Sequence, residues 1–80
     1  MRPSVHHPRY TTLRLHLKEL RQAAALTQVE LAARLEVEQS YLSKIERGER
    51  YVDILFYIDW CKACGVVPGD AFLRLTAADA

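Results

Sequence analysis

Two short helical segments follow one another closely between Thr27 and Gly48, and this pair constrains the fold more than any other part of the chain. Thr27 and Glu30 have the spacing of a capping box, which predicts a helix from Gln28 to about Leu35. A second periodic segment runs from Val37 to Arg47, and Gly48 is placed to end it. Two helices joined so closely form one compact unit, and in one kind of such unit they meet at a steep angle.

The rest of the chain also carries helical patterns, without the alternation that is typical of strands. Apolar residues recur at helical spacing from Thr12 to Ala24. Asp53 is placed to begin a longer helix, which ends at Gly65. Pro68 suits the first position of a last helix. Together these segments predict an all-α fold of five helices.

The length and composition of the chain indicate a single domain. Eighty residues, half of them hydrophobic, suffice for one core. We expect a flexible N-terminal arm at residues 1–10, the folded domain at 11–76 and a C-terminal tail at 77–80. We find no signal peptide and no segment that could span a bilayer, which favours a cytoplasmic protein without a membrane partner. Eleven basic and ten acidic residues leave a net charge of +1, which is weak support for a nucleic-acid partner.

The two paired helices each have an apolar and a polar side. Leu31 and Leu35 face inward from the first helix. Leu42 and Ile45 do so from the second, and Ala32 lies at the crossing, where a small side chain is required. The polar residues at 38, 39, 40, 43, 44 and 47 form one exposed face. This is the geometry of a helix-turn-helix, whose second helix fits the major groove of DNA.

The segment LTQVELAARLEVEQSYLSKIERGER, Leu26 to Arg50, resembles the phage-repressor/Cro-like helix-turn-helix family of bacterial transcriptional regulators (the xenobiotic-response-element type). The resemblance extends from about Leu17 to Leu73, and its most specific elements are TQ, LA and SKIERG at fixed spacing. It implies a compact five-helix, lambda-repressor-like DNA-binding domain, with the helix-turn-helix at helices two and three. It also implies a regulator rather than an enzyme, with no cofactor and no small-molecule ligand.

The resemblance implies roles for particular side chains. Gln39, Ser40 and Lys44 match the positions that read bases, where glutamine suits adenine and lysine suits guanine. Arg21 and Glu46 match an ion pair between the first helix and the end of the third. The positions expected at the sugar-phosphate backbone are Gln28, Tyr41, Ser43, Arg47 and Arg50.

Two acidic residues depart from the family pattern at the turn. Glu36 stands where the family usually has a glycine in the left-handed conformation, which costs a non-glycine residue about 1 kcal/mol. Glu38 stands where a serine or threonine cap is common. Residues 36–50 contain four acids and three bases, so this segment is not basic. These departures predict modest DNA affinity or dependence on a second subunit.

The cysteines and histidines suggest other chemistry, which the remaining residues do not favour. Cys61 and Cys64 have redox-motif spacing, but they lie at the end of a helix, where the helix dipole disfavours a thiolate. We favour buried core for both cysteines over a redox or metal-binding role. His6, His7 and His16 have no zinc-ligand spacing, and we expect them to be solvated, so no metal site is predicted.

The helix after Asp53 and the last helix carry more apolar residues than one core needs. Ile54, Tyr57, Ile58, Cys61 and Cys64 are expected to point inward. An exposed apolar cluster implies a covering surface, and two-fold operators require a dimer. The residues expected at a homodimer interface are Trp60, Phe72, Leu73 and Leu75.

We therefore expect a sequence-specific transcriptional regulator, with a repressor among the possibilities, that binds a palindromic operator in double-stranded DNA as a homodimer. One alternative is an antitoxin-like protein–protein interaction module with weak DNA binding. A thiol- or metal-responsive regulator is the third possibility. The salt dependence of DNA binding distinguishes the first two, because phosphate contacts release counterions.

Overall fold

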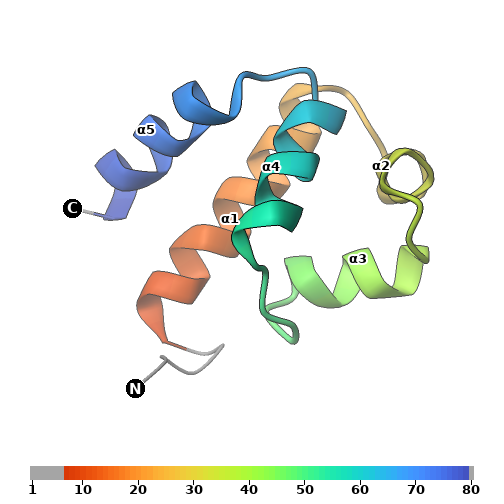
Figure 1. Ribbon diagram of the computed structural model, residues 1–80. Helices are drawn as coiled ribbons and strands as arrows, with labels where there is room; N and C mark the ends of the chain where they lie inside the picture. The colour runs from red at the N-terminus through yellow and green to blue at the C-terminus, as the bar shows by residue number, and fades with distance from the viewer. Residues whose placement is uncertain (1–6, 80) are drawn as a thin grey trace.

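The computed structural model describes residues 7–79, and within this range the chain forms five α-helices and no strand (Figure 1). The helices are α1 (Pro8–Ala23), α2 (Gln28–Leu35), α3 (Gln39–Glu46), α4 (Ile54–Ala63) and α5 (Pro68–Asp79). The predicted all-α fold is confirmed. Over this described range, no helix is long and apolar enough to cross a membrane.

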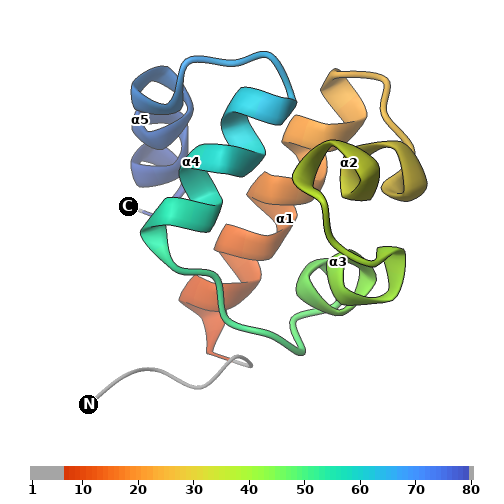
Figure 2. The ribbon, with the colours of Figure 1, turned by 45° about the vertical axis from the view of Figure 1, so that its right-hand side comes forward.

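Helices α1 and α4 lie at the centre, with α5 on one side and the α2–α3 pair on the other (Figures 1 and 2). Packing contacts join α1 to α3 and α5, and join α4 to α2 and α5. Helix α2 also packs directly on α3. The helix-turn-helix therefore occupies one end of the molecule, away from α5.

Both ends of the helical region extend further than the sequence pattern predicts. Helix α1 begins at Pro8 rather than Thr12, because a proline at the first helical position needs no partner for an amide hydrogen. The Nδ1 atom of His7 accepts a hydrogen bond from the Arg9 amide (3.2 Å) and caps this helix. Residues 8–10, expected in a flexible arm, are thus helical, whereas His6 lies outside the described residues. Helix α5 continues to Asp79, where a tail was expected, and Asp79 pairs with Arg9 (2.8 Å).

The turns around α2 follow local sequence signals. The Thr27 hydroxyl accepts a hydrogen bond from the Glu30 amide (3.1 Å), and the Glu30 carboxylate accepts one from the Thr27 amide (2.9 Å), which confirms the capping box. Glu36 ends the helix in the left-handed conformation, with φ 58° and ψ 41°. The turn therefore has the left-handed backbone conformation that glycine usually adopts, although the residue there is a glutamate. Ala25 adopts the same φ before α2, which the sequence did not signal.

The core confirms the inward positions expected for Tyr57, Cys61 and Cys64 of α4 and corrects those of Ile54 and Trp60. Trp60, predicted at a dimer interface, is fully buried, and its Nε1 donates a hydrogen bond to the Leu17 carbonyl (3.0 Å). Ile54, predicted to point inward, is 60% exposed. The buried stripe of α4 is Tyr57, Trp60, Cys61 and Cys64. Because α4 is apolar over much of its circumference, periodicity did not settle the edges of the inward side, and packing against α1 places Trp60 there.

His16 is also buried, which corrects the expectation that it is solvated. Its Nε2 shares a 2.8 Å hydrogen bond with the Tyr57 hydroxyl, and the two rings stack with centroids 5.9 Å apart. Helix α5 packs along this side of α1 and brings Arg74 toward the imidazole. The sequence of α1 places His16 on the polar side of that helix. The periodicity of one helix does not show which other helix packs against it, so the contact with α5 could not be predicted.

Candidate nucleic-acid interface

The exposed face of α3 presents the residues expected to read bases. Gln39 and Ser40 are exposed at its first turn, and Lys44 is half-buried one turn later. Helix α2 lies across α3 at a steep angle (Figure 1), and the outer side of α3 remains uncovered by the other elements (Figure 2). The structure therefore brings these three side chains together on one surface, because they recur at helical spacing.

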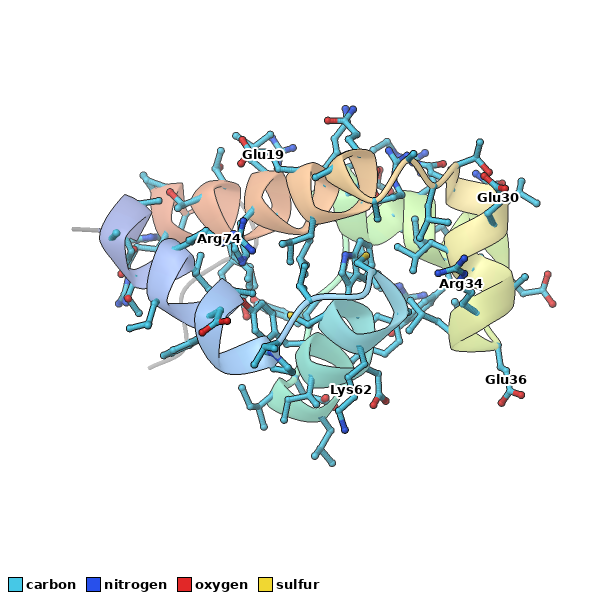
Figure 3. All side chains as sticks on the ribbon, turned by 90° about the horizontal axis from the view of Figure 1, so that it is seen from above. Glu19, Glu30, Arg34, Glu36, Lys62 and Arg74 are labelled. Carbon is cyan, nitrogen blue, oxygen red and sulfur yellow. The ribbon has the colours of Figure 1, made fainter. Side chains whose placement is uncertain are left out.

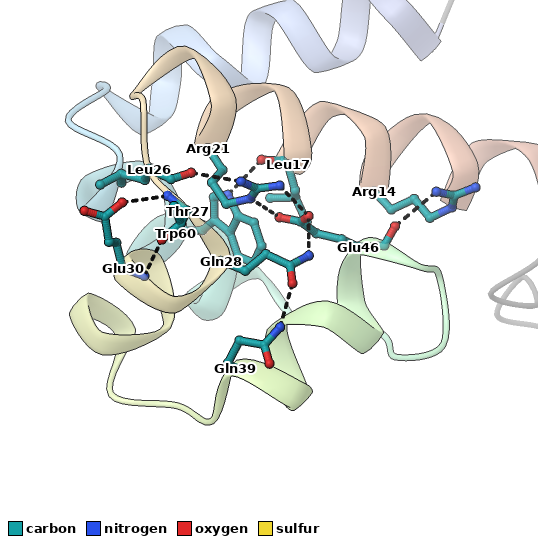
Figure 4. Close-up of polar contacts among 10 residues, drawn as sticks. All are labelled: Arg14, Leu17, Arg21, Leu26, Thr27, Gln28, Glu30, Gln39, Glu46 and Trp60. Atoms are coloured by element: carbon teal, nitrogen blue, oxygen red, sulfur yellow. Dashed lines mark hydrogen bonds and ion pairs between the residues drawn. The ribbon is translucent and has the colours of Figure 1, made fainter.

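A buried ion pair anchors the end of α3 to α1. Arg21 Nε donates to Glu46 Oε2 (2.6 Å) and Arg21 Nη2 donates to Glu46 Oε1 (3.0 Å) (Figure 4). The Glu46 side chain is only 3% exposed. The hydrogen bond with Glu46 raises the pKa of Arg21. Arg21 Nη1 also donates to the Leu26 carbonyl (2.8 Å), so the guanidinium joins α1, the loop before α2 and α3.

The same carboxylate is connected to the first turn of α3 through two glutamines. Gln28 Nε2 donates to Glu46 Oε1 (3.0 Å), and Gln39 Nε2 donates to Gln28 Oε1 (2.7 Å) (Figure 4). The network Arg21–Glu46–Gln28–Gln39 thus spans α1, α2 and α3. Gln28 was expected to contact a DNA phosphate. In the structure, both polar atoms of its side chain form hydrogen bonds within the protein.

The C-terminal end of α3 carries basic groups that are already paired. Arg47 Nε donates to Glu49 (2.6 Å), and Arg47 Nη1 donates to the Ser43 hydroxyl (2.8 Å). The hydrogen bond raises the pKa of Arg47 and lowers that of the Glu49 carboxyl. The Arg50 guanidinium lies 5.8 Å from the centre of the Tyr41 ring, in a cation–π contact.

The start of α3 is acidic and lacks a side-chain cap. Glu38 is the N-cap residue, but its carboxylate makes no cap hydrogen bond. Glu36 projects away from the molecule at the end of α2 (Figure 3). The surface at the start of α3 is therefore acidic rather than basic, as the sequence indicated. A DNA phosphate passing here would meet the exposed carboxylates of Glu36 and Glu38.

Two arginines hold the helix-turn-helix in place without having been identified as site residues. Arg14 Nη1 donates to the Glu46 carbonyl (3.0 Å) and so satisfies the end of α3. Arg34 Nη1 donates to the Ala63 carbonyl (2.8 Å) and joins α2 to the end of α4 (Figure 3). Both acceptors are backbone carbonyls at helix ends, which side-chain patterns do not reveal.

Comparisons with known proteins now identify the family. The helix-turn-helix domain family matches residues 12–75. Among solved structures, an XRE-family-like protein from Pseudomonas syringae pv. tomato str. DC3000 is 42% identical, with a TM-score of 0.81, over 91% of this chain and 89% of that one. The chain belongs to the XRE family of helix-turn-helix proteins. As an XRE-family member it is a DNA-binding regulator of transcription.

Two further solved structures resemble this XRE-family chain over most of its length. The restriction-modification controller protein C.AhdI from Aeromonas hydrophila is 31% identical over 78% of this chain and 94% of its own, with a TM-score of 0.69. The clp gene regulator ClgR from C. glutamicum is 28% identical over 99% and 97%, with a TM-score of 0.77. No curated protein sequence matches the chain.

The cysteines of this XRE-family chain lie in the core rather than at the interface. Cys61 and Cys64 are free and buried, next to Trp60 and Tyr57 on the inner stripe of α4. Burial raises the pKa of the Cys64 thiol to about 11 and also raises that of Cys61, so both remain protonated at neutral pH. Between residues 7 and 79, no three histidine, cysteine or acidic side chains converge as metal ligands.

The residues expected at a homodimer interface differ in their exposure. Phe72 and Leu73 are exposed on α5, with Leu73 at 69%, while Leu75 is half-buried. Ile54 and Leu55 of α4 are exposed as well, and of these two only Ile54 was expected to point inward. Trp60 is excluded from this surface, since its side chain lies in the core.

Proposed function

We propose that this chain is a sequence-specific regulator that reads a palindromic operator as a homodimer, with α3 in the major groove. The single observation that supports this most is the exposed face of α3, which the Arg21–Glu46–Gln28–Gln39 network holds in a fixed position. A pre-ordered reading helix loses little conformational entropy when it binds. DNA as the partner implies that the protein acts in the bacterial cytoplasm.

In this proposal the first turns of α3 contact base edges. Gln39 uses one Nε2 hydrogen for Gln28, which leaves its second hydrogen and its Oε1 for an adenine. Ser40 is adaptable and reads either a donor or an acceptor. Lys44 donates to the acceptors of guanine. Each such contact discriminates against a wrong base by about 1–3 kcal/mol.

Other side chains contact the sugar-phosphate backbone and set the position of the helix. Gln28 keeps one Nε2 hydrogen for a phosphate beside the start of α2, where the helix dipole favours an anion. Arg47 exchanges Glu49 for a phosphate on binding. The remaining backbone contacts are assigned to Tyr41, Ser43 and Arg50.

The homodimer supplies the second reading helix that a palindrome requires. Its proposed surface combines the exposed apolar residues Ile54, Leu55, Phe72 and Leu73, with Leu75 beneath them. C.AhdI and ClgR are named as a controller protein and a gene regulator, which agrees with a regulatory role for this chain.

Selection from random duplexes tests the proposed function. We expect a two-fold-symmetric motif, with half-site centres about ten base pairs or a multiple apart. Gln39→Ala and Lys44→Ala should each remove the preference for one base pair while leaving the helical circular dichroism spectrum unchanged. If the folded protein enriches no motif at low salt, the proposal is wrong.

One set of observations favours a second candidate, a protein-interaction module. Glu36 and Glu38 are exposed beside α3, and Glu49 already occupies Arg47. A surface of this charge suits a basic protein partner better than phosphates. The salt dependence separates the two functions, because the logarithm of DNA affinity should fall linearly with the logarithm of salt concentration, in proportion to the phosphates neutralised.

A further inference from the structure

A groove of about 520 Å³ lies between α1 and α5. Its α1 wall is a stripe of residues at helical spacing, from Thr12 to Ala23, and its α5 wall contains Arg74 and Ala78. The two alanines leave space between the helices because their side chains end at Cβ. The volume lies in the range of about 300–1,000 Å³ that is typical of small-molecule sites. The groove therefore has room for a small organic ligand.

The floor of the groove contains a buried polar ring. His16 lines the groove and is only 8% exposed. Its Nε2 shares the 2.8 Å hydrogen bond with the Tyr57 hydroxyl, whereas Nδ1 has no hydrogen-bond partner among residues 7–79. Every fully buried side-chain nitrogen or oxygen in this range has a partner, so Nδ1 reaches the open space that His16 lines. A ligand in the groove can supply the hydrogen-bond partner that polar groups at buried positions normally have.

Arg74 supplies a positive charge beside this ring. Its side chain extends from α5 toward α1 (Figure 3), and it lies close enough to His16 for its charge to lower the pKa of the imidazole. The other arginines between residues 7 and 79 each contact a carboxylate, a backbone carbonyl or an aromatic ring. Arg74 has no such partner within this range. A guanidinium beside a ring N–H offers several donors and no acceptor, an arrangement that suits a carboxylate.

The remaining walls limit the kind of anion that fits. Leu15, Leu20 and the two alanines form an apolar surface, which suits a compact hydrocarbon body. Glu19 lies at the outer edge of α1, away from α5 (Figure 3), and its carboxylate repels a second negative charge on the ligand. The groove thus favours a carboxylate with a single charge and an apolar body over a phosphate or a dicarboxylate.

We propose that the groove between α1 and α5 binds a small organic monocarboxylate, with Arg74 paired to the carboxylate and His16 Nδ1 donating a hydrogen bond to it. The Tyr57 hydroxyl donates to His16 Nε2, which leaves the ring hydrogen on Nδ1. The apolar wall covers the body of the ligand. The bound carboxylate connects α5 to α1 and stabilises the folded protein. This site lies apart from α3, so ligand binding does not depend on the proposed reading of DNA.

Titration of the isotope-labelled protein with sodium benzoate, followed by NMR, tests the proposal. Benzoate is a probe with one carboxylate and a compact apolar ring. The backbone amide signals of groove residues on α1 and α5 should shift in a saturable way, with a dissociation constant of about 1 mM or lower. Benzamide has the same ring without the charge, and inorganic phosphate has charge without the ring. Both should bind about tenfold more weakly or less well still.

Two variants test the charged and the apolar part of the groove separately. Arg74→Gln should weaken benzoate binding by about tenfold or more, because a hydrogen bond to a charged group is lost. Lys62→Gln is the matched control, since it removes one positive charge from an exposed position on α4 away from the groove (Figure 3), and it should bind benzoate like the unaltered protein. Ala23→Leu fills the groove from α1 and should prevent binding without changing any charge. Circular dichroism confirms that each variant compared is folded.

Several results would overturn the proposal. The absence of any saturable shift with benzoate would show that the groove does not bind this class of ligand. Equal binding by the unaltered protein and a folded Arg74→Gln variant, or shifts confined to residues outside the groove, would assign the anion to another surface. Benzamide binding as tightly as benzoate would show an apolar groove that does not recognise a carboxylate. Each of these results would leave the proposed function unaffected.

Discussion

At the scale of single residues, buried polar side chains in this protein each have a defined partner. His16 shares its hydrogen bond with the Tyr57 hydroxyl, and Trp60 donates to the Leu17 carbonyl. Between residues 7 and 79, no fully buried side-chain nitrogen or oxygen lacks a hydrogen-bond partner. These bonds join α1 to α4 across the core and offset the cost of burying polar atoms.

His16 should make stability depend on pH. Burial lowers the pKa of its imidazole below the ordinary 6.5, and the nearby Arg74 lowers it further, although Glu19 acts in the opposite direction. As pH falls, the unfolded chain therefore binds this proton before the folded protein does. The contribution of His16 is complete above about pH 6.5 and decreases on acidification toward the folded pKa.

Urea unfolding between pH 8 and pH 5 measures this dependence. The control is His16→Gln, which keeps a polar group near Tyr57 but does not titrate. The free energy of unfolding should fall more steeply for the unaltered protein than for the variant. Identical slopes for both proteins would show that the pKa of His16 is the same in the folded and the unfolded chain, contrary to our expectation.

At the scale of elements, the α2–α3 turn combines strong local signals with one strained residue. The Thr27 capping box begins α2, and the turn that follows positions α3. Glu36 adopts φ 58° without the glycine that relieves such a conformation. The turn is thus held by packing of the two helices and by the Val37 amide, which donates to the Ala32 carbonyl (3.0 Å).

Glu36→Gly should stabilise the protein by about 1 kcal/mol, because glycine adopts positive φ without a Cβ clash. Glu36→Ala is the matched control, since it removes the same carboxylate but keeps the Cβ atom. Only the glycine variant should raise the free energy of unfolding in denaturant titrations. Equal gains for both variants would assign the effect to charge rather than to backbone strain.

The end of α3 provides a prediction about DNA affinity. Glu49 hydrogen bonds Arg47 in the free protein (2.6 Å), so binding to a phosphate must displace it. Glu49→Gln should strengthen binding to all duplexes equally, by up to about fivefold at low salt. Fluorescence anisotropy with a selected and a scrambled duplex measures this change. A gain confined to the selected duplex would place Arg47 at a base edge instead.

At the scale of the whole molecule, the surfaces proposed for DNA and for a second copy lie on opposite sides of the α1–α4 centre. Helices α2 and α3 form one side and α5 the other (Figure 1). The apolar residues exposed near α5 are available for a second copy without covering α3.

Leu73→Glu should weaken this dimer, because a carboxylate would have to be buried at the interface. Sedimentation at tens of micromolar should find the unaltered protein dimeric and the variant monomeric, with the same helical content. Val29→Glu, an equally exposed apolar position on the distant helix α2, serves as the control and should stay dimeric. A monomeric unaltered protein at that concentration would remove the dimer from the proposal.

Much of the fold could be predicted from the sequence, because the signals that carry it are local. The Thr27–Glu30 box, the stop at Gly65 and the start at Pro68 depend on residues within a few positions of each other, and each was confirmed. The pairing of α2 with α3 and the exposed face of Gln39, Ser40 and Lys44 followed from the same periodicity.

Other features depend on contacts between residues far apart in the chain, which periodicity cannot reveal. The inward side of α4 is fixed by the bond between Trp60 and Leu17, since α4 is apolar on several sides. The burial of His16 requires α5 to pack along α1. Gln28 donates its hydrogen bond to a carboxylate 18 residues away. The local pattern thus specified which helices form, whereas long-range packing and hydrogen bonding specified which of their faces meet.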